Sequence, residues 1–151
     1  MSAVIQLISG QDFEPSSYND QGIGVPYITG ASNIVNEELI INRWTPTPRC
    51  ISMKGQLLIV CKGAGVGKMV IMNQNEAHIA RQIMSICPHG IYVEYIRIFL
   101  QYSLFTLREH MQGVIPGISR DDVLNLIIPI PPLQEQKRIA TRIDNINSLL
   151  K

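Results

Sequence analysis

The chain has 151 residues, enough for one domain with its own hydrophobic core. Hydrophobic residues make up 46% of it, but charged residues only 17%, against about 25% in an average domain. We therefore expect part of the surface to face protein rather than water. The net charge of +1 gives no general excess of positive charge, so any surface that binds nucleic acid must come from local clustering of basic side chains.

The sequence contains no segment that predicts a membrane span. The longest apolar stretch, residues 91–107, is interrupted by Glu94, Arg97 and Gln101. The first residues lack the basic start and apolar run of a secretory signal. Three cysteines without a C-x-x-C pair are typical of reduced thiols. Together these features predict a cytoplasmic protein.

The first third of the chain predicts short strands separated by loops. Residues 4–8 and 25–29 have strand patterns, and residues 9–24 between them are rich in Gly, Ser, Asn, Asp and Pro. A loop of this length exceeds most connections in compact domains, and such loops are usually functional or mobile. Residues 33–42 predict further short strands, and residues 43–49 form a proline-containing loop with the only tryptophan.

The middle of the chain predicts a hairpin. Residues 56–61 form a continuous apolar run, which indicates a strand buried on both faces, and residues 69–72 are its natural antiparallel partner. Three glycines in the connection, residues 62–68, permit a tight turn. Residues 78–86 are expected to be extended and to end before Pro88.

Two helices follow. Residues 92 to about 111 predict a helix embedded in the core, with Glu94, Arg97 and Gln101 on one narrow solvated side. Ser119 is expected to cap a short second helix, because acidic residues follow it in the first turn. The elements together predict an α+β (mixed α/β) fold, with a small twisted, largely antiparallel sheet and an embedded helix.

The C-terminal end predicts an exit from the domain. An apolar strand over residues 125–132 runs into Pro129, Pro131 and Pro132, which lack backbone donors, so it must be a sheet edge or the exit itself. We therefore expect one domain over residues 1–132.

The last residues, 133–151, are expected to begin a coiled-coil-type spacer or dimerisation helix. Apolar residues recur with heptad spacing at Ile139, Ile143, Ile146 and Leu150. Two heptads are marginally stable alone, so this seam is expected to pack on a second helix. The alternative is an amphipathic helix folded back on its own domain.

The glycine-rich connection does not satisfy a nucleotide-binding motif. Lys62 stands where a P-loop needs its first glycine, Met69 replaces the Ser or Thr, and Lys68 replaces the third glycine of a dinucleotide fingerprint. Exposed amides and two flanking lysines could still hold a DNA phosphate. The histidines lack metal-ligand spacing, and residues 117–121 miss the nucleophile elbow. No cofactor, metal or catalytic role is expected.

Basic and amide side chains lie largely outside the predicted core segments. Arg and Gln can read base edges, while Lys mostly contacts phosphate. The alternative is an ordinary solvated surface. The candidate DNA-binding residues are Arg43, Trp44, Lys54, Lys62, Gly65, Lys68, His78, Arg81, Gln82 and Arg120.

The run IPIPPLQEQKRI at residues 128–139 resembles the signature that closes a target recognition domain in specificity (S) subunits of type I restriction–modification systems. Shorter similarities agree with it in order: ISGQ at 8–11, VPYITG at 25–30, KGQLLI at 54–59, GAGVG at 63–67, AHIARQ at 77–82 and GISR at 117–120.

The resemblance implies a non-catalytic subunit that binds one half of a split double-stranded DNA target. The expected partners are methyltransferase (M) subunits, which carry S-adenosylmethionine, and a restriction (R) subunit, which uses ATP. A second recognition domain or a second copy of the chain would pack on the C-terminal helix. Two other hypotheses stay open: a small enzyme that binds a phosphorylated ligand or nucleotide at the Gly63–Gly67 loop, and a helical interaction scaffold without DNA contact.

Overall fold

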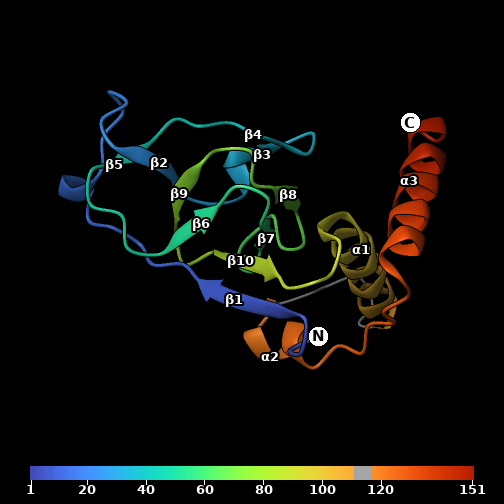
Figure 1. Ribbon diagram of the computed structural model, residues 1–151. Helices are drawn as coiled ribbons and strands as arrows, with labels where there is room; N and C mark the ends of the chain where they lie inside the picture. Colours follow the sequence, from blue (N-terminus) through green and yellow to red (C-terminus); the bar gives the residue numbers. More distant parts are fainter. Residues whose placement is uncertain (111–116) are drawn as a thin grey trace.

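The computed structural model describes residues 1–110 and 117–151, and it places most strands in one body with two helices at its side (Figure 1). The strands are β1 Ile5–Ser9, β2 Val25–Ile28, β3 Ile34–Val35, β4 Glu38–Leu39, β5 Trp44–Thr45, β6 Ile51–Met53, β7 Leu57–Val60, β8 Met69–Ile71, β9 Glu76–Ile79 and β10 Ile83–Pro88. The helices are α1 Val93–His110, α2 Arg120–Leu124 and α3 Leu133–Leu149, with 3-10 turns η1 Pro15–Ser17 and η2 Ala31–Asn33.

The described strands form two four-stranded sheets and one short hairpin. The first sheet has the order β1-β10-β7-β8 and is antiparallel throughout. The second has the order β5-β2-β9-β6, and its β2–β9 pair is parallel. Among the described residues, strands β3 and β4 pair with each other alone. The predicted α+β class with antiparallel pairing and a C-terminal helix is confirmed, although the strands divide between two sheets.

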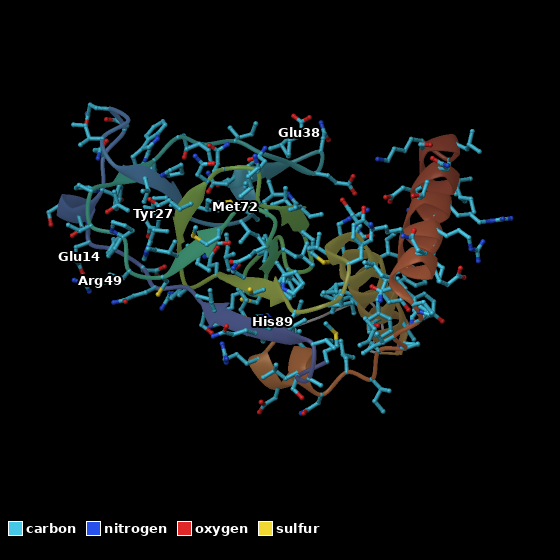
Figure 2. The ribbon with its side chains drawn as sticks, in the orientation of Figure 1. Glu14, Tyr27, Glu38, Arg49, Met72 and His89 are labelled. Atoms are coloured by element: carbon cyan, nitrogen blue, oxygen red, sulfur yellow. The ribbon has the colours of Figure 1, made fainter. Side chains whose placement is uncertain are left out.

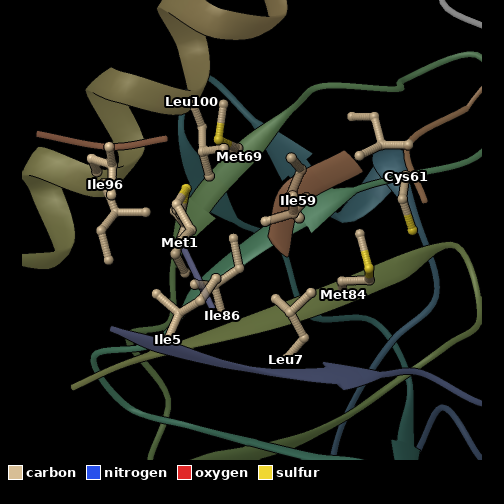
Figure 3. Close-up of a cluster of buried hydrophobic side chains, with 14 of the residues drawn as sticks. Met1, Ile5, Leu7, Ile59, Cys61, Met69, Met84, Ile86, Ile96 and Leu100 are labelled. Carbon is tan, nitrogen blue, oxygen red and sulfur yellow. The ribbon is translucent and has the colours of Figure 1, made fainter. Parts of the chain in front are cut away.

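Strand β7 lies between two hydrophobic clusters, as its continuous apolar sequence predicts. Leu57 and Ile59 belong to one cluster, to which α1 contributes Ile96 (Figure 3). Leu58 and Val60 belong to the other cluster, which fills the space toward the second sheet. Side chains alternate along a strand, so four consecutive apolar residues supply both cores. The predicted hairpin with β8 is also confirmed.

The prediction of one extended segment over residues 78–86 is wrong. The chain turns after β9 and enters the other sheet as β10, with Ile83 N donating to Ala80 O at 2.9 Å. The turn lies against Gly10 so closely that a Cβ on this glycine would be 1.9 Å from Ala80 O. The segment itself contains no glycine or proline that would mark the turn. The glycine that the turn requires is Gly10, which is distant in the sequence.

Helix α1 is close to its predicted limits, but its environment differs from the prediction. Met111 lies outside the described residues. Ile96 and Leu100 are buried, whereas Tyr102 and Phe105 are exposed. The polar side is not solvated as expected, because α3 covers Arg97 and leaves its side chain only 11% exposed. The mixture of apolar and polar residues on α1 therefore reflects packing against a second helix.

The segment between α1 and α3 confirms one prediction and corrects another. Ser119 caps α2: Asp122 N donates to Ser119 Oγ at 3.1 Å, and Ser119 N donates to Asp122 Oδ2 at 2.7 Å. Residues 125–132 form no strand, so the prolines mark the exit from the domain rather than a sheet edge.

Helix α3 runs beside α1 at the edge of the molecule (Figure 1). Its buried residues are Gln136 and Ala140. The Gln136 side chain accepts a hydrogen bond from Tyr92 N at 2.8 Å and donates one to Pro131 O at 2.9 Å. This amide ties the beginning of α3 to the beginning of α1, and the small Ala140 lets the two helices approach closely.

We predict that Ile59→Ala and Leu58→Ala each lower the free energy of unfolding by about 2–5 kcal/mol, because each removes a fully buried side chain from one of the two clusters. Urea denaturation followed by circular dichroism measures this. Ile127→Ala is the control: its side chain is 91% exposed, so a change within about 0.5 kcal/mol is expected. Equal losses in all three variants would contradict the two-core arrangement.

Candidate nucleic-acid interface

A polar recess of about 470 Å³ lies where several loops of the second sheet meet. It is formed by segments far apart in the sequence: the long first loop, the end of β2, the loop before β5, and the turn between β9 and β10. Its lining residues are Asp12, Phe13, Tyr18, Tyr27, Thr29, Ser32, Asn42, Arg43, Ala80 and Gln82. Two of the predicted DNA-binding residues, Arg43 and Gln82, therefore share one concave surface.

The glycine-rich loop lies next to this recess. A Cβ built on Gly63 would be 3.8 Å from Gln82 Oε1, and one built on Gly65 would be 2.2 Å from Ala31 Cβ. Gly65 is thus needed for close packing against the 3-10 turn η2. Lys62 and the other flanking lysine of the loop, Lys68, are exposed. The loop leads into β8 rather than into a helix, so it provides no helix N-terminus for a nucleotide phosphate.

Arg81 stands at the rim of the recess. Its Nε lies 2.9 Å from Asp12 Oδ2, and its backbone N–H donates to the same carboxylate at 3.0 Å. Both side chains are at least half exposed, so water screens the pair and it contributes little to stability. Asp12 therefore orients this cation without burying it.

The prediction that His78 contacts DNA is wrong, because the structure buries this side chain completely. Nδ1 accepts hydrogen bonds from the backbone N–H groups of Arg49 and Cys50, each at 3.1 Å. The proton therefore resides on Nε2, which donates to Gln11 O at 2.6 Å. The ring stacks on Phe13 at 4.0 Å between centroids. Burial lowers the pKa of His78, so the imidazole is a neutral anchor for the long first loop.

Three other candidates do not line the recess. Trp44 is half-buried in β5, where its backbone pairs with Pro26 of β2. Lys54 is exposed in the turn between β6 and β7. Arg120 donates from Nη1 to Leu7 O at 3.2 Å and to Ser9 Oγ at 2.9 Å, which ties α2 to β1.

Sequence reasoning missed several residues of the recess, of which Asp12, Tyr18 and Asn42 carry polar groups suited to recognition. Figure 2 shows side chains of this region around the labelled Tyr27. The length of the first loop was the available signal, because it indicates a functional segment. The loop carries no basic residue, however, so positive charge does not mark it as a DNA-binding segment.

The predicted helix-packing residues divide into two groups. Ile139 and Ile143 face α1, where they line an apolar groove of about 370 Å³ with side chains such as Tyr95. Ile146 and Leu150 are exposed. The first part of α3 thus folds back on its own domain, as the alternative hypothesis holds. Packing of the exposed part on a partner helix stays a prediction.

Within residues 1–110 and 117–151, no helix is long and apolar enough to cross a membrane. The three cysteines are free thiols.

The type I restriction modification DNA specificity domain family matches residues 4–151 of this chain. The chain belongs to this family. A putative type I restriction enzyme MjaX specificity subunit from Methanocaldococcus jannaschii is 30% identical over 149 residues, which are 97% of this chain.

Solved structures of specificity subunits have the same fold. The HsdS subunit from Thermoanaerobacter tengcongensis superimposes with a TM-score of 0.83 at 27% identity over 98% of the chain. A structure from work on complex assembly and conformational transition of the type I R-M system has a TM-score of 0.85, at 27% identity over 97% of this chain. The S subunit from M. genitalium, at 18% identity over 94% of the chain and a TM-score of 0.68, agrees in fold.

This specificity-family chain spans only about a third of these relatives. It covers 35% of the M. jannaschii protein, 36% of the T. tengcongensis and M. genitalium subunits, and 37% of the remaining structure.

We predict that burial of neutral His78 makes the specificity domain less stable in mild acid. The pKa of His78 is lowered in the folded state, whereas an unfolded chain takes up this proton near about pH 6.5. The free energy of unfolding should therefore fall as the pH drops below about 6.5, with a contribution of up to about 1.4 kcal/mol per pH unit.

Urea denaturation between about pH 7 and pH 5 tests this. His78→Gln should be less stable near neutral pH, because it loses the imidazole's stacking, but its stability should decline less steeply with acid. Parallel curves for the two proteins would show that His78 is protonated equally in the folded and unfolded states.

Proposed function

We propose that this chain reads one half of a split double-stranded DNA target as part of the specificity component of a type I restriction–modification system. The observation that carries the proposal is the family match, which runs from residue 4 to residue 151 and names a DNA specificity domain. The chain itself would be non-catalytic and would act in the cytoplasm.

The chemistry of the recess supports base recognition. Arg43, Gln82 and Asn42 present guanidinium and amide groups, which form paired hydrogen bonds with guanine and adenine edges in the major groove. The exposed Lys62 and Lys68 on the neighbouring glycine loop are suited to backbone phosphates, which fix the register but carry no sequence information.

The net charge of +1 is consistent with a reader that partners hold on DNA, because few phosphate contacts give a modest electrostatic contribution to binding. In this proposal methyltransferase subunits and a restriction subunit dock around the chain. The exposed part of α3 packs on a second recognition domain's helix or on a second copy, so that helix length sets the gap between half-sites.

We expect the positive side chains around the recess to contribute to the affinity of the chain for duplex DNA. Arg81→Ala and the double variant Lys62→Ala/Lys68→Ala should each weaken binding of a labelled duplex. Each phosphate contact that is lost should also reduce the slope of log affinity against log salt by about 0.9. Fluorescence anisotropy at several salt concentrations measures both quantities with the full 151-residue chain.

Arg142→Ala serves as the charge-matched control, because Arg142 is an exposed cation on α3, away from the recess. It should bind like the wild type. If Arg81→Ala and the lysine variant also bind like the wild type while remaining folded, the loops are not a DNA surface and a protein-binding scaffold becomes the better account.

A further inference from the structure

A charged cleft of about 550 Å³ lies between the β3–β4 hairpin, α1 and α3, with Arg97 among its lining residues. The guanidinium contacts all three elements. Its Nε lies 2.6 Å from Glu94 Oε2, and its Nη1 donates to Gln101 Oε1 at 3.2 Å, both within α1. Its Nη2 lies 2.7 Å from Asp144 Oδ1 of α3, and its Nη1 lies 3.8 Å from Glu37 Oε1 of the hairpin.

The position of Glu37 breaks a local sequence rule. Asn36 and Glu37 both have left-handed backbone conformations, with φ of 51° and 62°. Two-residue hairpin loops of this kind favour Asn followed by Gly, so Asn36 is suitable and Glu37 is not. A side chain larger than glycine in this conformation is unfavourable and persists where the surroundings hold it.

The carboxylate of Glu37 makes contacts that a glycine at this position could not make. It lies at the tip of a hairpin that reaches toward α3 (Figure 1). Besides Arg97, it pairs with Lys151 beyond the end of α3, at 3.9 Å between Oε2 and Nζ. A glycine would relieve the backbone but remove both contacts with the helices.

The C-terminal half of α3 has few other contacts that could fix its direction. Gln136 and Ala140 are its buried residues, and both lie in the first half. Residues 145–151 are exposed. The helix is therefore held over residues 136–143 by the Gln136 amide, by Ala140 and by the apolar side chains that face α1. Ion pairs hold it further along. Two separated points of attachment define a direction, whereas the first alone would allow the helix to swing.

We propose that Glu37, Arg97 and Asp144 form an ionic clamp that fixes the direction in which α3 leaves the recognition domain. Glu94 and Asp144, within hydrogen-bond distance, compensate the cost of burying the positive charge of Arg97. Glu37, 3.8 Å away at the more exposed edge of the cleft, adds an electrostatic attraction. On the proposed function, this direction determines which separation between two half-sites the whole subunit accepts.

The test measures the distance between the domain and α3 in the full chain. Spin labels are attached at two exposed positions, Asn73→Cys in the turn after β8 and Asn145→Cys on α3. Cys50 and Cys87 are changed to Ser so that they are not labelled. Double electron–electron resonance gives the distance distribution. In Glu37→Gly, which keeps a turn-compatible residue and loses the carboxylate, the distribution should broaden and its centre should move.

Asn36→Gly is the matched control, because it places glycine in the same turn and keeps the carboxylate of Glu37. Its distribution should coincide with that of the parent protein. Glu37→Gln, which preserves the side-chain shape without the charge, should broaden the distribution as Glu37→Gly does. High salt should have the same effect on the parent protein.

The clamp is overturned if Glu37→Gly and Glu37→Gln both give the parent distribution. It is also overturned if Asn36→Gly broadens the distribution equally, since the turn rather than the charge would then be responsible. The sample contains no DNA, so a negative result would contradict the clamp but not the proposed function. The duplex-binding variants test the proposed function separately.

Discussion

Two buried polar contacts attach α3 to the rest of the domain and set its position. At its base, the Gln136 amide bonds to Tyr92 N and Pro131 O; further along, the buried Arg97 guanidinium bonds to Asp144. A buried amide and a buried cation tolerate few alternative arrangements, because an unpaired polar group in such a place is costly. The junction therefore gives α3 a defined origin at the exit from the domain.

The burial of β7 on both faces stabilises the sheets that support the loops of the recess. Its four residues supply both hydrophobic clusters, of which one joins the first sheet to α1 and the other joins the two sheets. The loops that form the polar recess project from the second sheet, and buried His78 anchors the long first loop by hydrogen bonds to Gln11, Arg49 and Cys50. A recess built from distant segments can vary in its side chains while the cores below it remain unchanged.

Sequence reasoning located the elements with clear local signals. The apolar run of β7, the Ser119 cap, the glycine hairpin and the helices α1 and α3 all follow from pattern, propensity or capping. It failed where a distant contact decides the structure. The turn between β9 and β10 depends on Gly10, and the burial of Arg97 depends on α3, which no window of sequence around either site reveals.

The candidate site was predictable in part. Arg43, Arg81, Gln82 and the glycine loop were identified from residue type, and the structure brings them to one region. His78 was misassigned because its two backbone donors, Arg49 and Cys50, are about 30 residues away, beyond the reach of periodicity. Asp12 and Tyr18 were missed because acidic and aromatic loop residues carry no signal of positive charge.

Selection of bound duplexes from a random pool would show whether the loops of this domain read a DNA sequence. The chain would be assembled with a type I methyltransferase subunit, and the recovered duplexes sequenced. We expect enrichment of a short half-site motif, with relaxed preference at one position of that motif for Gln82→Ala. Recovered duplexes with the composition of the starting pool would contradict it.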